Sequence, residues 1–85
     1  MSKKVWAFDV NGNEHTVELD YNSLTLSGEV FIDGKYLISW GWSLRSREIP
    51  FEVGGKNAVL KFIVNHLSRN KQVLYVNDIL IKESK

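Results

Sequence analysis

The chain has 85 residues, no cysteine, and 11 Lys and Arg against 10 Asp and Glu, which leaves a net charge of +1. This length holds one domain, so we treat residues 1–85 as a single unit. The balanced charge gives no reason to expect nucleic acid or a membrane as partner, and a protein without cysteine has neither disulfides nor thiolate zinc sites. Met1–Lys4 begins like a secretory signal, but the apolar stretch that follows is too short and contains Asp9. We therefore expect a soluble, cytoplasmic protein.

The first part of the chain predicts a β-hairpin. Apolar residues alternate with other residues through Val5–Val10 and again through His15–Tyr21, and Asn11-Gly12 lies between these stretches. A period of two is typical of strands with one buried face, and Asn-Gly is a preferred pair for a tight hairpin turn. The acidic residues of the second stretch fall on its outer face. Asn22–Gly28 is rich in turn-forming residues and is predicted to be a loop.

The stretch from Val30 to Val53 holds the longest alternating run of the chain, and Asp33-Gly34 predicts a second hairpin turn before it. Because a domain this small needs its large side chains inside, we expect one face of the run to join the core. That face consists of Tyr36, Ile38, Trp40, Trp42 and Leu44.

Two residues interrupt the pattern of this stretch. Gly41 indicates either a bulge or bend, or a place where another backbone or a ligand approaches closely. Pro50 lacks a backbone N–H, so the strand that contains it either begins at a break or lies at the edge of a sheet.

The segment Asn57–Ser68 fits a strand and also fits an amphipathic helix. Its β-branched residues and the Gly54-Gly55 turn before it favour the strand. Two short strands, Val73–Val76 and Ile79–Ile81, follow, with a turn between them, and residues 83–85 are expected to be a solvated tail. About seven or eight short strands with short connections predict an all-β fold, a small antiparallel β-sandwich.

Few residues suggest chemistry. His15 lies on the apolar face of its strand and His66 lies near a polar turn, and no nucleophile motif accompanies either of them. We therefore predict no enzymatic activity, no catalytic residues, no cofactor and no metal. An enzyme would gain support only if a cleft joined one histidine to a buried carboxylate.

The remaining candidate is a possible binding surface. Exposed aromatic rings stack on sugars, bases or arginines, and arginines lie close behind the tryptophans in the sequence. Burial of the tryptophans in the core is the competing and favoured interpretation, and the arginines, which fall on the opposite parity, are expected to face solvent. The surface would consist of Trp40, Trp42, Arg45 and Arg47.

The order of several short motifs resembles one domain of the Fas apoptotic inhibitory molecule family. The similarity covers about residues 15–81. It rests on His15-x-Val17-x-Leu19, Ser27-Gly28, Ile32-Asp33-Gly34-Lys35, Trp40 and Trp42, Phe51-x-Val53-Gly54, and Val76-Asn77. Family members usually carry two such domains and this chain has one, so an apoptotic role does not carry over.

The resemblance implies an antiparallel β-sandwich and a cytosolic, non-enzymatic protein of a family linked to protection against protein aggregation. We accordingly expect a protein-interaction or protective domain whose partner is another protein or a second copy of itself. The alternative is a small module that binds carbohydrate or peptide on Trp40 and Trp42.

Overall fold

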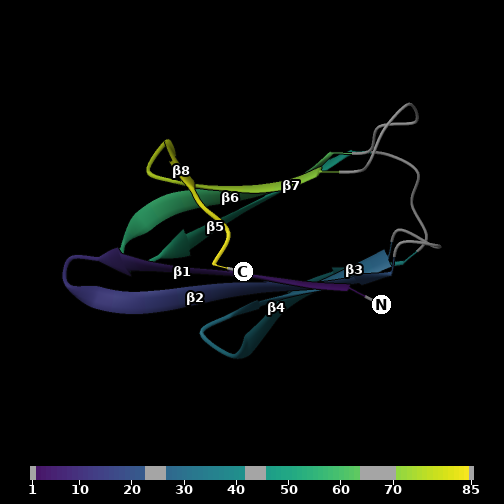
Figure 1. Ribbon diagram of the computed structural model, residues 1–85, viewed down its shortest axis with the longest axis horizontal. Coiled ribbons are helices and arrows are strands. Elements are labelled where there is room, and N and C mark those ends of the chain that lie inside the picture. The colour runs from purple at the N-terminus through teal and green to yellow at the C-terminus, as the bar shows by residue number, and fades with distance from the viewer. Residues whose placement is uncertain (1, 23–26, 42–45, 64–70, 85) are drawn as a thin grey trace.

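The computed structural model describes residues 2–22, 27–41, 46–63 and 71–84. These residues form eight strands and no helix, arranged as two antiparallel four-stranded sheets with the orders β1-β2-β3-β4 and β5-β6-β7-β8. The sheets lie face to face as two layers (Figure 1), so the prediction of an all-β sandwich is confirmed. The strands are β1 (Ser2–Val10), β2 (Asn13–Asn22), β3 (Ser27–Ile32), β4 (Lys35–Trp40), β5 (Arg47–Val53), β6 (Lys56–Ile63), β7 (Lys71–Val76) and β8 (Ile79–Ile81).

Four tight turns of one kind connect the strands in pairs. Each has two central residues with positive φ, for example 52° and 84° in the first turn, and this is the geometry of a type I′ turn. Asn and Asp tolerate this backbone region, and Gly enters it without steric cost. All four turns are at positions that the sequence predicts: Asn11-Gly12, Asp33-Gly34, Gly54-Gly55 and Asn77-Asp78.

The ambiguous segment after Gly55 is a strand over residues 56–63, and residues 64–68 lie outside the described residues. Ala58, Leu60 and Phe62 are buried, as the alternating pattern of a strand requires. The strand interpretation is therefore confirmed for the described part of the segment. This segment, β6, is a central strand of the second sheet and pairs with both β5 and β7.

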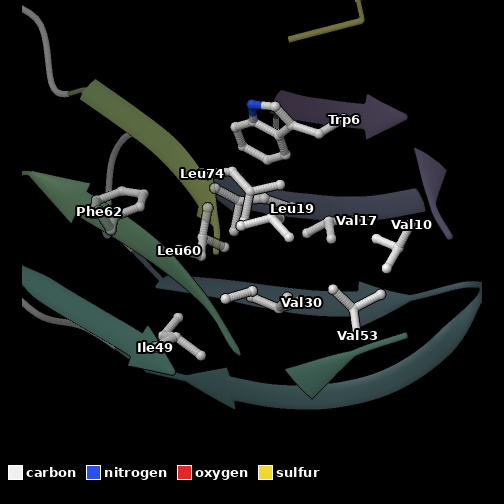
Figure 2. Close-up of a cluster of buried hydrophobic side chains, with 12 residues drawn as sticks. Trp6, Val10, Val17, Leu19, Val30, Ile49, Val53, Leu60, Phe62 and Leu74 are labelled. Carbon is white, nitrogen blue, oxygen red and sulfur yellow. The ribbon is translucent and has the colours of Figure 1, made fainter. Parts of the chain in front are cut away.

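One hydrophobic cluster fills the space between the sheets (Figure 2). Trp6 from the first sheet and Phe62 from the second are its largest members, each about 1% exposed. Burial of a large apolar side chain contributes about 1.5–3 kcal/mol, so this cluster is the main source of stability. Its members are Trp6, Val10, Val17, Leu19, Val30, Ile49, Val53, Ala58, Leu60, Phe62, Leu74 and Val76.

Several boundaries differ from the prediction. Strand β3 begins at Ser27, so the expected loop is shorter at its C-terminal end, and its remaining part at 23–26 lies outside the described residues. Strand β4 ends at Trp40, Gly41 is outside it, and the remaining part of the predicted run at 42–44 lies outside the described residues. Pro50 lies within β5, at the edge of the second sheet, which confirms the prediction for this residue.

Glu83 and Ser84 are not part of a solvated tail as the sequence suggests, and residue 85 lies outside the described residues. The Ser84 N–H donates to the Val5 carbonyl at 2.8 Å, and the Ala7 N–H donates to Ser84 Oγ at 2.7 Å. Lys4 Nζ lies 3.0 Å from Glu83 Oε1. The residues after Ile81 are polar, and polar residues predict a solvated tail. The chain instead returns to the edge of β1 (Figure 1), a long-range contact that the local sequence does not indicate.

Candidate functional site

The structure brings together two of the four residues of the predicted binding surface. The Arg47 guanidinium carbon lies 5.3 Å from the centroid of the Trp40 ring, a cation–π distance. Even- and odd-numbered residues lie on opposite faces only within one strand. Trp40 and Arg47 belong to strands of different sheets, so this rule does not separate their side chains. Arg47 is exposed, as expected, but it covers the tryptophan. Trp42 and Arg45 lie outside the described residues.

The Trp40 ring is also packed from within the sandwich. Its centroid lies 5.7 Å from that of Phe62, with the rings edge to face at 74°, and the side chain is half-buried against the core. A sugar or base stacking on Trp40 would have to compete with Arg47 for the ring. The packing interpretation therefore describes Trp40 well, and a ligand platform that includes Trp42 stays a prediction.

Gly28 makes this position of Trp40 possible, a role that the sequence by itself does not indicate. A Cβ atom on Gly28 would lie 2.7 Å from Cζ2 of the Trp40 ring, whereas a Cβ on Gly41, the predicted site of a bulge or close approach, would have no atom of the other described residues within 4 Å. Gly28 and Trp40 are paired across β3 and β4. That this glycine lies opposite this tryptophan in the neighbouring strand can be recognised only once the strand register is known.

The free edge of β4 exposes large hydrophobic side chains to solvent. The strand belongs to the edge of the first sheet, and Tyr36, Leu37 and Ile38 are 58%, 38% and 38% exposed. The prediction that Ile38 is a core residue is wrong, since this edge has no strand beyond it in the described residues and the side chain stays partly in solvent. Leu44, also predicted for the core, lies outside the described residues.

A bulge in β4 changes which side chains share a face. Val30 pairs with Ile38, but the next residue of β3, Phe31, pairs with Tyr36, so Leu37 is an extra residue. The bulge moves Tyr36 to the outer face, where its ring meets that of Phe31 at 6.1 Å and its hydroxyl lies 2.8 Å from Ser39 Oγ. Tyr36 and Ile38 were expected on one face; the inserted residue puts them on opposite faces.

The other three edge strands are protected in different ways. The C-terminal residues cover part of β1, and β8 has only three residues. Strand β5 places Pro50 between the exposed Glu48 and Glu52. Short strands, proline, charged side chains and covering segments are the usual means by which edges avoid pairing with other chains. In β4 only Lys35, at its first position, is charged, and the bulge is its one interruption.

A hollow of about 360 Å³ lies beside the C-terminal end of β4. Asp20 from β2 and Glu29 from β3 line it, and these two residues are directly paired across the strands. Two carboxylates in this relation repel each other, so the hollow is a place that favours a cation. Its lining residues are Asp20, Tyr21, Asn22, Ser27, Gly28, Glu29, Ser39, Trp40 and Gly41.

A second polar cluster fixes the turn between β3 and β4. His15 Nδ1 lies 2.8 Å from Asp33 Oδ2, the Thr16 N–H donates to Asp33 Oδ1 at 2.8 Å, and the Asp33 N–H donates to the Thr16 carbonyl at 2.9 Å. The hydrogen bond with His15, and then that from Thr16, lower the pKa of the Asp33 carboxyl below its ordinary value of 3.8.

The pair of His15 and Asp33 does not meet the condition set for an enzyme. The Asp33 side chain is 43% exposed, whereas the condition requires a buried carboxylate. Neither the hollow beside β4 nor a second hollow between Phe8–Asn11 and the β7–β8 hairpin is lined by His15 or Asp33. The pair instead ties a turn to the neighbouring strand. His66 lies outside the described residues, so its role stays a prediction.

Within the described ranges, no group of three or more His, Cys, Asp or Glu side chains is placed to hold a metal ion. The same residues contain no helix long and apolar enough to span a membrane. Searches of protein-family models, curated proteins and solved structures find no match to the chain. The geometry of the β4 edge is therefore the basis for a functional proposal.

Proposed function

We propose that the protein is a non-enzymatic interaction domain that accepts an additional β-strand at the edge of β4. One observation carries the proposal: among the described edge strands of six or more residues, β4 is the one that has neither a covering segment nor internal charges nor a proline. An edge of this kind offers backbone N–H and C=O groups to an extended segment, and these hydrogen bonds give affinity without requiring a particular sequence.

The side chains of β4 suit such a role. Leu37 and Ile38 expose apolar surface next to the free edge, and Tyr36 adds an aromatic ring with a polar tip. Alternate side chains of an added strand would contact these residues. The bulge at Leu37 bends the ladder, so the added strand has to follow the bend or pair with only part of β4.

The resemblance to the Fas apoptotic inhibitory molecule family supports the same kind of role. It implies a cytosolic protein of a family linked to protection against aggregation. Segments that aggregate are extended, apolar and low in charge, and they have the properties that an uncharged strand edge accepts. We infer that the protein acts in the cytoplasm, by pairing β4 with exposed strands of other polypeptides.

An NMR titration tests the proposal. An amyloid-forming peptide of alternating valine and threonine, added to isotope-labelled protein, is expected to shift the backbone amides of β4 and to gain a lag in its own fibril formation. Leu37→Lys puts a charge at the edge and should remove both effects. Leu80→Lys is the matched control, since Leu80 is 59% exposed in β8 of the other sheet. Shifts that avoid β4, or equal loss in the two variants, would contradict the proposal.

A further inference from the structure

We propose that the hollow between β1 and the β7–β8 hairpin, here called the β1–β8 hollow, binds a small carboxylate with an apolar chain, such as a medium-chain fatty acid. The site is independent of the proposed function, because β1 and β4 are opposite edges of the first sheet. The hollow has a volume of about 340 Å³, near the lower end of the range of about 300–1,000 Å³ for small-molecule sites. Its apolar lining consists of Phe8, Val10, Val76, Ile79 and Ile81.

The apolar lining comes from the inner faces of the two sheets. Val10 and Val76 are 7% and 6% exposed and belong to the core, and Phe8 shares the face of Val10 by alternation along β1. Ile79 pairs directly with Val76 across β7 and β8, so the two side chains share a face, yet Ile79 is 62% exposed. The β1–β8 hollow therefore continues the core outward, and an apolar chain bound in it would cover the exposed part of Ile79.

The two sides of the hollow are tied to each other by the end of the chain. Ile81, the last residue of β8, lines the hollow and packs against the core. Beyond it the chain crosses to the edge of β1 (Figure 1), where the Ser84 N–H donates to the Val5 carbonyl at 2.8 Å. Lys4 and Glu83 add an ion pair of 3.0 Å to the same crossing. Because these contacts hold β8 near β1 before any ligand arrives, binding has little ordering to supply.

One cation adjoins the apolar lining. Lys56 also lines the hollow, and it pairs across the β5–β6 turn with Val53, which is buried in the core. The side chain of Lys56 therefore begins on the inner face of the second sheet. Among the described residues, its ammonium group has no ion pair or hydrogen bond. An unpaired ammonium next to apolar surface complements a carboxylate on an apolar chain.

The other polar residues of the lining are compatible with an anion. Asp9 alternates with Phe8 and Val10 in β1, so its side chain belongs to the outer face of the sheet. Asn11 and Asn77 line the hollow from two of the tight turns, and a side-chain amide can donate hydrogen bonds. Next to the inner-face apolar residues, the charge that meets a ligand is therefore positive.

The lining favours an alkyl chain over a peptide segment. A peptide brings backbone N–H and C=O groups, which cost free energy when they are buried without partners. The inner-face side chains of the hollow offer one polar group, the Lys56 ammonium. A fatty acid likewise has one polar end, and the rest of the molecule is apolar.

An NMR titration with sodium octanoate tests the proposal. The methyl signals of Ile79 and Ile81 should shift and saturate, whereas the amides of β4 should not shift. Across hexanoate, heptanoate and octanoate, the affinity should rise by up to about fourfold for each methylene, because each one adds apolar surface that is buried. Octylammonium has the same chain and the opposite charge, so it should bind more weakly. Equal or tighter binding of octylammonium would overturn the assignment to a carboxylate.

Ile79→Glu and Leu80→Glu are a matched pair of variants. The two residues are 62% and 59% exposed in the same strand, but only Ile79 lines the hollow. Ile79→Glu puts a negative charge at the site and should weaken octanoate binding by at least about tenfold, because like charges repel. Leu80→Glu should bind octanoate as wild type does. Equal affinities of the two variants would show that the ligand binds elsewhere.

Lys56→Met removes the cation and keeps most of the apolar side chain. It should weaken octanoate binding by about three- to fivefold, as for an ion pair near solvent, and leave the binding of uncharged octanol unchanged. Lys71→Met is the control, since Lys71 does not line the hollow. Equal octanoate affinities of Lys56→Met and Lys71→Met would overturn the role of Lys56 and with it the choice of a carboxylate.

Thermal unfolding establishes that each variant is folded, and the titrations of the wild-type protein decide the inference without any variant. Wild-type protein whose Ile79 and Ile81 signals do not shift at millimolar octanoate overturns it. This outcome leaves the proposed function standing, because the valine–threonine peptide is expected at β4. Loss of the peptide effect with octanoate binding intact would overturn the proposed function alone.

Discussion

The last hairpins of the two sheets begin alike and end differently. Both β3–β4 and β7–β8 are closed by type I′ turns. After β8 the chain continues to the first sheet, where Ser84 binds the edge of β1, whereas the free edge of β4 receives no strand from the described residues. Turn chemistry decides that a hairpin forms. The chain after β8 covers part of the edge of β1, whereas no described segment covers β4, which is also twice as long as β8, and this makes β4 the candidate interaction surface.

The largest expected difference between the hairpins is in stability. Leu74 of β7 is fully buried, and Ile38 of β4 is 38% exposed. Leu74→Ala should lower the free energy of unfolding by about 2–5 kcal/mol, the range for buried large-to-small changes. Ile38→Ala should lower it by less than about 1 kcal/mol. Urea unfolding of both variants measures the contrast, and equal losses would mean that β4 is as much part of the core as β7.

The second prediction concerns the contact that holds the end of β4. Gly28→Ala would bring a Cβ to 2.7 Å from the Trp40 ring. Because Phe62 and Arg47 also hold this ring, we expect a loss of about 1–3 kcal/mol, typical of overpacking. The indole N–H signal of Trp40 should shift in NMR spectra.

Gly41→Ala is the control for this change, since a Cβ on Gly41 would have no atom of the other described residues within 4 Å. Its effect on unfolding should stay within about 0.5 kcal/mol. A larger loss in Gly41→Ala than in Gly28→Ala would show that the backbone conformation of Gly41 matters more than the packing of Trp40.

The third prediction makes the two turns more alike. Asp78 has a φ of 66°, and at the corresponding second position of the β3–β4 turn the residue is Gly34, with a φ of 82°. Asp78→Gly removes the steric cost of a side chain in this region and should raise the free energy of unfolding by up to about 1 kcal/mol. A destabilised variant in thermal unfolding would show that the Asp78 side chain itself supports the turn.

The smallest expected effect is the acid sensitivity of the β3–β4 turn. The pKa of Asp33 is lower in the folded protein than its ordinary value of 3.8, because His15 and Thr16 bind the carboxylate. A carboxylate with a lowered pKa stabilises the fold above its unfolded pKa, and this contribution disappears as the pH falls through the folded pKa. Asp33→Asn keeps a residue that tolerates positive φ and removes the charge.

Unfolding curves at pH 5 and below pH 3 measure this effect. Wild type should be the more stable protein at pH 5, and its advantage over Asp33→Asn should shrink at the lower pH. Asp78→Asn serves as control, because the Asp78 carboxylate forms no hydrogen bond or ion pair among the described residues. An advantage that persists below pH 3 would show that the negative charge of Asp33 does not stabilise the turn.

Sequence reasoning succeeded for features that depend on neighbours along the chain. Alternation identifies β1, β2 and β6 because a strand with one buried face repeats every two residues. The turn pairs are equally local, since residues such as Asn11 and Gly12 are chosen for the backbone angles they can adopt. An all-β fold with short antiparallel connections follows from these two signals together.

Sequence reasoning failed for features that depend on partners far along the chain. The alternation that begins at Tyr36 predicts that Tyr36 and Ile38 share the inner face of the sheet. A bulge puts them on opposite faces, and this bulge depends on how β4 pairs with β3. The contact between Trp40 and Arg47 likewise joins two sheets, and no period in the sequence describes it.

The sequence by itself determined the strands, the turns and most of the core of this protein, because backbone preference and apolar periodicity act over a few residues. The tertiary structure decided which strand edges are covered, since Glu83 and Ser84 reach β1 from the other end of the chain. It also decided that β4 lies at the margin of the first sheet, where burial depends on the strand next to it and apolar residues such as Leu37 and Ile38 remain partly exposed.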